Sequence, residues 1–239
     1  MIASLPMYLR PELLAPLSRY WDSLRDHLRD ARFDAPYQLD HKMIGLEAWR
    51  RPDLLLSQTC GAPFRDHLHA DVHLIGTPDP QLPSCPPGYY QSVFIARAEL
   101  DWAKAAKSTW AANEKGSQSG YYAAKLRAGF PLTNPIWSGG HLASIEMVKS
   151  GRVEWAAIDA ITWNIARRFD DLNAVLVWDR SPPSPGLPYI TALGNDVQSL
   201  SSAVRSAIFD LEETDRNALQ IFNLVAISKA DYLNMPKPS

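Results

Sequence analysis

Two glycine-containing segments in the middle of the chain carry the small polar side chains that suit binding of an anion. The first, residues 113–120, reads Asn-Glu-Lys-Gly-Ser-Gln-Ser-Gly and lies between a predicted strand and a predicted helix. The first turn of a helix has unpaired N–H groups and a partial positive charge, to which Ser117 and Ser119 would add compact hydroxyl donors. A helix cap followed by a flexible loop is the common alternative for such a sequence.

A second predicted helix start repeats this arrangement at residues 138–141, which read Ser-Gly-Gly-His. The glycine pair would let a ligand approach the backbone closely, while Ser138 supplies a hydroxyl and His141 an imidazole that can donate to an oxyanion. A capping or surface histidine explains His141 equally well. Two such helix starts facing one ligand would indicate an anion site more strongly than either alone.

Asp159 is the third residue in a position suited to ligand binding. It directly follows the apolar run of residues 155–158, at the carboxyl end of a predicted strand, where α/β sheets place their ligand contacts. Capping of the following helix is the simpler role for an aspartate there, and the sequence favours it.

Metal and redox chemistry find little support in the sequence. His67, His69 and His73 invite a zinc interpretation, but no glutamate or cysteine completes the set at a metal-ligand spacing, so we expect a solvated turn. Cys60 and Cys85 lack a Cys-x-x-Cys spacing and could form one disulfide or remain two thiols, the better expectation for a cytosolic chain. We therefore predict no metal and no cofactor.

The elements that position these residues follow from the alternation of short apolar runs with amphipathic stretches. This alternation is typical of β/α units over a largely parallel sheet. We predict strands near residues 2–5, 54–56, 72–75, 109–112, 155–158 and 189–193. We predict helices over residues 11–32, 120–127, 141–150, 160–169 and 197–211.

Two proline-rich segments divide the chain. Residues 76–88 and 181–188 are too rich in proline for regular structure, and we expect both to be stiff connectors. They bracket a central segment of β/α units. This predicts one lobe from residues 1–80 plus 188–239 and a second from residues 81–187.

The composition excludes several classes of protein. The 239 residues include 24 Lys and Arg and 26 Asp and Glu, and the basic residues are scattered, so a nucleic-acid binder is not expected. A hydrophobic content of 46% and a charged content of 21% are those of a globular protein. No apolar run reaches the roughly 20 residues of a membrane span, so we expect no membrane insertion.

The start of the sequence bears on the compartment. It has neither the basic region nor the cleavage site of a secretory signal. We therefore expect a cytoplasmic protein, or a periplasmic one from which the signal was removed beforehand.

Six short stretches, in this order along the chain, resemble the substrate-binding proteins of ABC importers for phosphate, phosphite and phosphonate. They are Pro-Met-Tyr ending at Tyr8, Ser-Gln-Thr-Cys-Gly at residues 57–61, Gly-Thr-Pro at Gly76, Ser-x-Ser-Gly from Ser117, the glycine-histidine turn at His141 and Ala-Ala-Ile-Asp ending at Asp159. The resemblance spans nearly the whole chain. It implies a type II periplasmic-binding-protein fold: two α/β lobes with mixed sheets and flanking helices, joined by two crossovers, with the ligand clamped between them.

The resemblance also implies which residues would hold a small anionic or zwitterionic solute. Ser117, Ser119 and the amides of Gly120 and Tyr121 would bind the oxyanion, and Asp159 would face an amine or hydroxyl at the other end of the ligand. A bridge between the two cysteines is compatible with the family if the chain meets an oxidising compartment. The full implied set is Tyr8, Gln58, Thr59, Ser117, Gln118, Ser119, Gly120, Tyr121, Ser138, His141 and Asp159.

The leading hypothesis is therefore a monomeric, non-catalytic binding protein for an oxyanion-bearing solute, with an ABC permease as the implied partner. An enzyme on the same scaffold, acting on a small organic acid or cofactor precursor, is the alternative, because Ser119 or Ser138 could be drawn with His141 and Asp159 as a hydrolase triad. The Gly-x-Ser-x-Gly turn of such enzymes is missing. A cytosolic sensor that passes ligand binding to a partner is a third possibility.

Overall fold

The computed structural model describes residues 1–238 and divides into two compact units. Unit 1 comprises Met1–Tyr89 and Pro185–Asn234, and unit 2 comprises Tyr90–Ser184 with the segment that follows Asn234. The predicted lobe boundaries fall at 80/81 and 187/188. That these units act as the two lobes of a ligand clamp stays a prediction, and each unit is described by itself.

The sheet of unit 1 is mixed, which corrects the expectation of a largely parallel one. Its strand order is β1-β2-β11-β3-β12, in which β1 runs parallel to β2 and every later pairing is antiparallel. The reason is that β11 and β12 belong to the part of the chain that returns after unit 2. The strands are β1 Ile2–Ser4, β2 Leu54–Gln58, β3 Val72–Asp79, β11 Tyr189–Ala192 and β12 Asn223–Val225.

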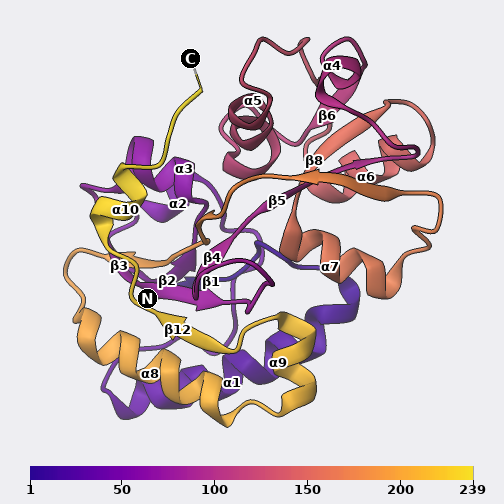
Figure 1. Ribbon diagram of the computed structural model, residues 1–239. Helices are drawn as coiled ribbons and strands as arrows, with labels where there is room; N and C mark the ends of the chain where they lie inside the picture. Colours follow the sequence, from indigo (N-terminus) through magenta and orange to yellow (C-terminus); the bar gives the residue numbers. More distant parts are fainter. Residues whose placement is uncertain (239) are drawn as a thin grey trace. The chain divides into compact units, whose positions relative to one another are not determined.

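Helices cover both faces of this sheet. Figure 1 shows α1 (Leu14–Asp30), α8 (Val197–Asp210) and α9 (Glu213–Leu219) on one face, where α8 packs on β3 and β12. The apolar residues of α1 recur every three or four positions, so one stripe of the helix is buried. The remaining elements are the 3-10 turn η1 (Pro11–Leu13) and, toward the other face, α2 (Leu46–Trp49), α3 (Gly61–Pro63), η2 (Phe64–Leu68) and α10 (Lys229–Leu233).

The first proline-rich segment contains more regular structure than expected. β3 runs on to Asp79 and includes Pro78, although residues 76–88 were predicted to be irregular. β11 pairs with β3 only as far as Gly76, so residues 77–79 have β12 on one side and no β11 partner on the other. Proline is tolerated in such an edge position because no ladder hydrogen bond is required of its nitrogen.

The sheet of unit 2 places three parallel strands side by side. Its order is β7-β6-β8-β5-β9; β7, β6 and β8 are parallel, whereas β5 is antiparallel to β8 and β9. The carboxyl ends of β7, β6 and β8 therefore lie at one edge of the sheet. The strands are β5 Ser92–Ala96, β6 Trp110–Ala112, β7 Ile136–Trp137, β8 Trp155–Asp159 and β9 Leu176–Arg180, and a separate small sheet pairs β4 (Tyr89–Tyr90) with β10 (Ser184–Pro185).

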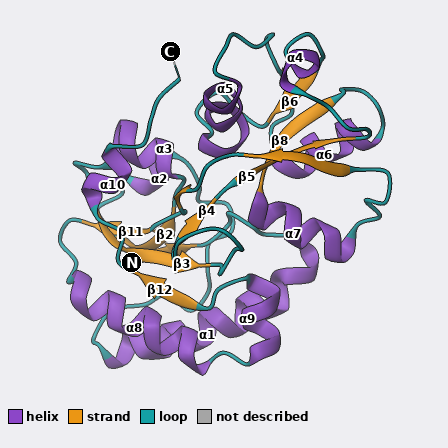
Figure 2. Cartoon of the chain, viewed as in Figure 1, coloured by secondary structure: helices purple, strands orange, loops and turns teal. Residues whose placement is uncertain are grey.

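The helices of unit 2 alternate with these strands, as the cartoon in Figure 2 shows. The predicted helices over 141–150 and 160–169 are confirmed as α6 and α7, and both pack on β8 and β5. The helical elements are α4 Trp102–Ala105, the π-helical turn η3 Gln118–Tyr122, α5 Ala123–Ala128, α6 His141–Lys149 and α7 Ala160–Phe169.

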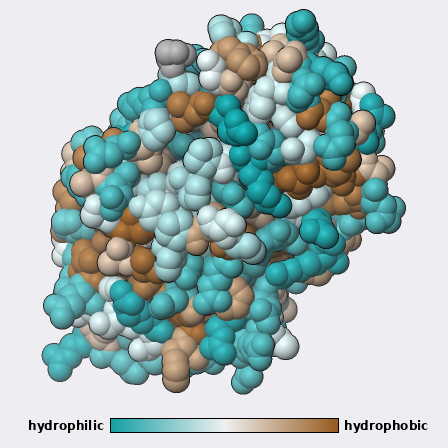
Figure 3. Space-filling view, viewed as in Figure 1, coloured by the Kyte–Doolittle hydropathy of each residue, from teal (hydrophilic) through white to brown (hydrophobic). Residues whose placement is uncertain are grey.

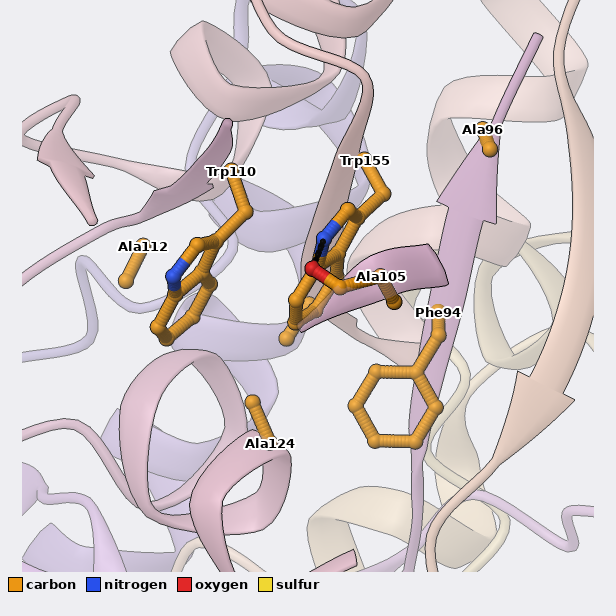
Figure 4. Close-up of a cluster of buried hydrophobic side chains, with 8 residues drawn as sticks. Phe94, Ala96, Ala105, Trp110, Ala112, Ala124 and Trp155 are labelled. Atoms are coloured by element: carbon orange, nitrogen blue, oxygen red, sulfur yellow. Dashed lines mark hydrogen bonds between the residues drawn. The ribbon is translucent and has the colours of Figure 1, made fainter. Parts of the chain in front are cut away.

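Aromatic side chains fill the core on one side of this sheet. The rings of Trp110 and Trp155 stack with their centroids 4.7 Å apart and lie beside Phe94, as Figure 4 shows. The indole N–H of Trp155 donates to the backbone carbonyl of Ala105 at 3.0 Å, so its polar atom is satisfied within the core. This packing fixes β6, the strand that leads into the first candidate site segment.

The surface visible in Figure 3 mixes hydrophobic and hydrophilic residues. The face drawn in Figure 3 has hydrophobic residues in small groups among hydrophilic ones, as is normal for a folded chain. None of the helices within residues 1–238 combines the length and the apolar character needed to span a bilayer.

Candidate functional site

Helix starts gather at the carboxyl edge of the three parallel strands of unit 2. β6 is followed by the turn that begins η3 and α5, β7 is followed directly by α6, and β8 is followed directly by α7. The N-terminal ends of these helices therefore lie along one sheet edge, where α/β folds place ligands. The three helix starts differ in which groups accept hydrogen bonds from their first N–H groups.

The first start is capped by its own serine. The hydroxyl of Ser117 accepts from the amide of Gly120 at 3.0 Å, and the carbonyl of Ser117 accepts from the amide of Tyr121 at 3.3 Å. The two amides implied as anion donors thus bond within the turn, and their contact with a ligand stays a prediction. The amides of Gln118 and Ser119 have no acceptor within residues 1–238, so the available donors lie earlier in the turn.

Close packing of neighbouring side chains leaves no room for a Cβ atom at Gly120. A Cβ atom at Gly120 would lie 1.8 Å from the side-chain oxygen of Asn113 and 3.2 Å from the hydroxyl of Ser117. The carbonyl of Asn113 accepts from the amide of Gly139 at 3.0 Å, so Asn113 also holds the second turn. Sequence reasoning did not single out Asn113; its position directly after β6 is the signal that could have identified it.

The second start has no side-chain cap. Gly140 is the N-cap of α6, and no side chain of the described residues 1–238 accepts from the first amides of that helix, those of residues 141–143. Gly139 adopts a left-handed conformation with φ of 82°, which favours glycine. The hydroxyl of Ser138 lies 2.6 Å from that of Ser144 and donates to the carbonyl of Gly140 at 2.9 Å, so it is occupied within its own turn.

The two starts meet through Ser119 and His141. The hydroxyl of Ser119 lies 2.8 Å from Nε2 of His141, across 22 positions of sequence. Ser119 is only 6% exposed, while His141 is partly buried. Both residues were predicted site residues, but the contact between them could not be predicted from the sequence.

The imidazole of His141 is uncharged at neutral pH. Burial lowers the pKa of His141 to about 4, an effect that the nearby carbonyl of Ala157 partly opposes. An anion bound beside His141 therefore meets neutral hydrogen-bond donors and helix dipoles instead of an imidazolium charge.

At the third start, that of α7, a carboxylate accepts from the first amides of the helix, so these amides cannot donate to an anion; we call such a start closed. Asp159 is 3% exposed, and its Oδ1 atom accepts from the amides of Ile161 at 2.7 Å and Thr162 at 3.2 Å. Asp159 is thus the cap of α7, the role that the sequence favoured. Contact of Asp159 with a ligand stays a prediction.

A hydrolase triad does not assemble from these residues. Nδ1 of His141 is buried and accepts or donates no hydrogen bond within residues 1–238, so no carboxylate orients the ring. Asp159 directs Oδ1 to the start of α7 instead. A serine–histidine pair without this third group lacks the part that stabilises the imidazolium formed during acyl transfer.

The residues implied from unit 1 lie together but are mostly enclosed. Tyr8 and Gln58 line a small pocket of about 30 Å³, which has room for about one water molecule. The side-chain amide of Gln58 donates to the carbonyl of Leu187 at 3.1 Å, and the amide of Thr59 donates to that of Pro188 at 3.1 Å. Thr59 is 0% exposed. Ligand contact by these residues stays a prediction.

The histidines and cysteines of unit 1 form no built site in the described part of the chain. Within residues 1–238, no three His, Cys, Asp or Glu side chains are placed to hold a metal ion. His67 lies in η2 and His73 in β3, where Nε2 of His73 bonds the carbonyl of Leu193 at 3.0 Å. No disulfide joins Cys60 and Cys85.

Comparison with solved structures identifies the fold. PhnD1 from Prochlorococcus marinus in complex with methylphosphonate matches with a TM-score of 0.71 and 14% identity, over 98% of this chain and 94% of that one. XAC2383 from Xanthomonas citri bound to ATP matches with a TM-score of 0.70 and 15% identity, over 96% and 92%. A binding protein component of an ABC phosphonate transporter from Pseudomonas aeruginosa matches with a TM-score of 0.68 and 14% identity, over 97% and 82%.

Comparison of sequences identifies the family. No curated protein matches the chain. Residues 68–234 match the family described as the periplasmic substrate-binding protein of phosphonate ABC transporters. This match confirms the predicted class, a non-catalytic solute-binding protein of the transport type with a permease as its implied partner. The chain belongs to the family of periplasmic substrate-binding proteins of phosphonate ABC transporters.

Proposed function

We propose that the chain binds a phosphonate at the helix starts of η3 and α6. The oxygens of the anion would accept from the amides of Gln118, Ser119 and His141 and from the hydroxyl of Ser119. The contact between Ser119 and His141 at 2.8 Å carries this proposal, because it brings two helix starts with unused N–H groups to one place. The solved complex of PhnD1 with methylphosphonate supports the same ligand class.

His141 would position Ser119 as a donor. If the neutral imidazole carries its proton on Nε2, that N–H donates to the oxygen of Ser119 and leaves the hydroxyl proton for the ligand. The low pKa of His141 keeps the ring neutral and this arrangement intact across the physiological range. The His141 N–H would then donate to Ser119, and the Ser119 hydroxyl would donate to the bound oxyanion.

Two buried acceptors favour a ligand that also carries a proton. The side-chain oxygens of Asn113 and Gln118 are buried and have no hydrogen-bond partner within residues 1–238. A buried polar atom left unpaired costs about 1 to 3 kcal/mol, so a ligand donor at this position would stabilise the complex. A phosphonate that retains one proton offers such a donor, whereas a sulfonate offers none. We expect phosphonates to bind more tightly than matched sulfonates.

The implied partner completes the proposal. A monomeric binding protein would deliver the solute to an ABC permease and release it unchanged. Size-exclusion chromatography with light scattering, with and without methylphosphonate, tests the monomeric state, and a stable dimer in both conditions would contradict it.

Calorimetry tests the binding site directly. The wild-type chain is titrated with methylphosphonate, phosphate, methanesulfonate and an amino acid, and Ser119→Ala is titrated with the tightest ligand. Loss of one hydrogen bond to a charged group is worth about 1.5 to 3 kcal/mol, so we expect affinity to fall by about ten- to hundredfold.

Ser150→Ala is the matched control for this experiment. Ser150 follows the other end of α6, where its hydroxyl bonds the carbonyl of Glu146 at 2.7 Å. We expect its affinity to equal that of the wild type. Unchanged binding by Ser119→Ala, or equal loss in both variants, would refute the assignment of the site.

A further inference from the structure

Four aromatic rings form a continuous series from the core of unit 2 to the edge that carries the candidate site. Trp155 stacks on Trp110 at 4.7 Å, and Trp110 stacks on Tyr121 at 6.2 Å with an interplanar angle of 7°. The ring of Tyr121 then meets that of Trp137 edge-on at 5.2 Å. The series begins with a fully buried ring, Trp155 at 0% exposure, and ends at Trp137, which is 48% exposed.

The exposed end of this series contacts the η3 turn and precedes the start of α6 in the chain. Trp137 is the last residue of β7 and directly precedes Ser138, while Tyr121 follows Ser119 by two positions in η3. Trp137 is paired with Ala112 in the sheet, which places it on the sheet face that Trp110 also occupies. Trp137 is thus in ring contact with the η3 turn that carries Ser119, and it precedes His141 by four positions in the chain.

Hydrogen bonds fix two neighbours of the exposed indole, the buried ring of Trp110 and the backbone of Ser138. The indole N–H of Trp110 donates to the carbonyl of Thr133 at 2.8 Å, and the amide of Ser138 donates to the carbonyl of Ala112 at 3.0 Å. An aromatic side chain whose supports are packed in this way loses little conformational freedom when a ligand packs on it. This distinguishes Trp137 from the scattered apolar residues of an ordinary surface.

A positive charge beside the ring of Tyr121 indicates which ligand substituents can pack there. The ammonium group of Lys125 lies 5.5 Å from the centroid of the Tyr121 ring. A second cation placed at these rings would be repelled by this ammonium group, whereas an uncharged apolar group would not be. The pair of rings formed by Tyr121 and Trp137 thus suits an apolar substituent better than an amine.

We infer that Trp137, supported by Tyr121, is a specificity residue that packs against an apolar organic substituent on the bound oxyanion. The inference rests on the proposed function, since it places the substituent next to an anion bound at Ser119. It names the solute class as organophosphonates with an aryl or comparably large apolar group, in preference to inorganic phosphate or aminoalkyl phosphonates.

Calorimetric titration with inorganic phosphate, methylphosphonate and phenylphosphonate tests this inference. We expect the wild-type chain to bind phenylphosphonate at least tenfold more tightly than methylphosphonate. Trp137→Ala should lose about tenfold for phenylphosphonate and less than threefold for methylphosphonate, whereas Trp137→Phe should keep most of the preference. The wild-type ratio of affinities needs no variant, so it decides even if Trp137→Ala does not fold.

Phe169→Ala provides the control. Phe169 is 43% exposed and ends α7, a helix of ten residues that starts at the site edge, so it lies about 15 Å from that edge. We expect its affinities to match those of the wild type.

The titrations distinguish failure of this inference from failure of the proposed function. Equal affinity for methyl- and phenylphosphonate, or equal loss for both ligands in Trp137→Ala, overturns the inference and leaves the proposed function standing. Absence of binding by every phosphonate overturns both.

Discussion

The helix starts at one edge of unit 2 differ in how they satisfy their first N–H groups. The start of α7 is closed, because Oδ1 of Asp159 accepts from the amides of Ile161 and Thr162. The start of α6 has a glycine cap and no side-chain acceptor among residues 1–238. At the start of η3 the hydroxyl of Ser117 accepts from the amide of Gly120, while the amides of Gln118 and Ser119 stay unpaired within the same range. A negative group is thus already built into one start, while the other two keep donors for a ligand.

This difference teaches where an anion can bind. A helix start attracts an anion through its dipole and its unpaired amides, and a carboxylate that caps the same start removes both attractions. The residue type at the cap decides the outcome: aspartate closes the start of α7, while serine and glycine leave the others open. Two substitutions and one change of pH test this difference between the helix starts.

The largest effect is expected from Gly120→Ala in the open start of η3. The added Cβ would overlap the side-chain oxygen of Asn113, so Asn113 and the turn that holds the unpaired amides of Gln118 and Ser119 must shift. We expect affinity for the best phosphonate to fall by about 100-fold, equivalent to about 2.8 kcal/mol. Isothermal titration calorimetry measures this loss.

Gly116→Ala is the matched control for this change. Gly116 lies in the same segment, but no atom outside its neighbours lies within 4 Å of a Cβ there. Its affinity should stay within threefold of the wild type. Comparable losses in both variants would show that the loop as a whole, and not the contact with Asn113, governs binding.

A smaller effect is expected from the pH dependence of His141, which joins the two open starts. Its pKa is lowered to about 4 in the folded chain, below the ordinary value near 6.5 of an unfolded one. Between these values the unfolded chain binds one more proton, so the free energy of unfolding should fall by about 1 kcal/mol per pH unit as pH drops from about 6.5 to 4. Urea unfolding at a series of pH values measures this slope.

His141→Gln removes the titrating group and keeps a side-chain N–H donor. We expect the contribution of this residue to the slope to disappear, while anion binding at pH 7 is partly retained. An unchanged slope in His141→Gln would mean that other groups cause the pH dependence.

The smallest effect is expected from opening the closed start with Asp159→Ala. Loss of the cap should lower the free energy of unfolding by about 1 to 2 kcal/mol. Affinity for methylphosphonate should change less than threefold, since the donors of η3 and α6 remain. Thermal unfolding and calorimetry on the same sample give both values.

The implied ligand role of Asp159 can be distinguished in the same variant. If Asp159 faces an amine on the solute, Asp159→Ala will lose about tenfold or more in affinity for 2-aminoethylphosphonate but not for methylphosphonate. Equal small changes for both ligands would leave the carboxylate with its capping role alone.

Much of the fold could be predicted because the local sequence determines it. α7 was predicted with the bounds Ala160–Phe169, since an apolar strand, a capping aspartate and a helical spacing follow one another there. Short helices such as α2 and α10 were not predicted, because helices of four or five residues depend on tertiary packing for their stability. The strand through Pro78 was missed for a similar reason, since its tolerance depends on which neighbours β3 has.

The same distinction between local sequence and tertiary packing applies to the candidate site. The two serine- and glycine-containing helix starts and the aspartate cap could be predicted from the sequence, because they depend on residues a few positions apart. Tertiary packing alone brings the hydroxyl of Ser138 to that of Ser144, the hydroxyl of Ser119 to His141, and the ring of Trp137 to that of Tyr121. The physical reason is that a hydrogen bond forms only within about 3 Å, and distances between segments far apart in the chain are set by packing of the whole sheet.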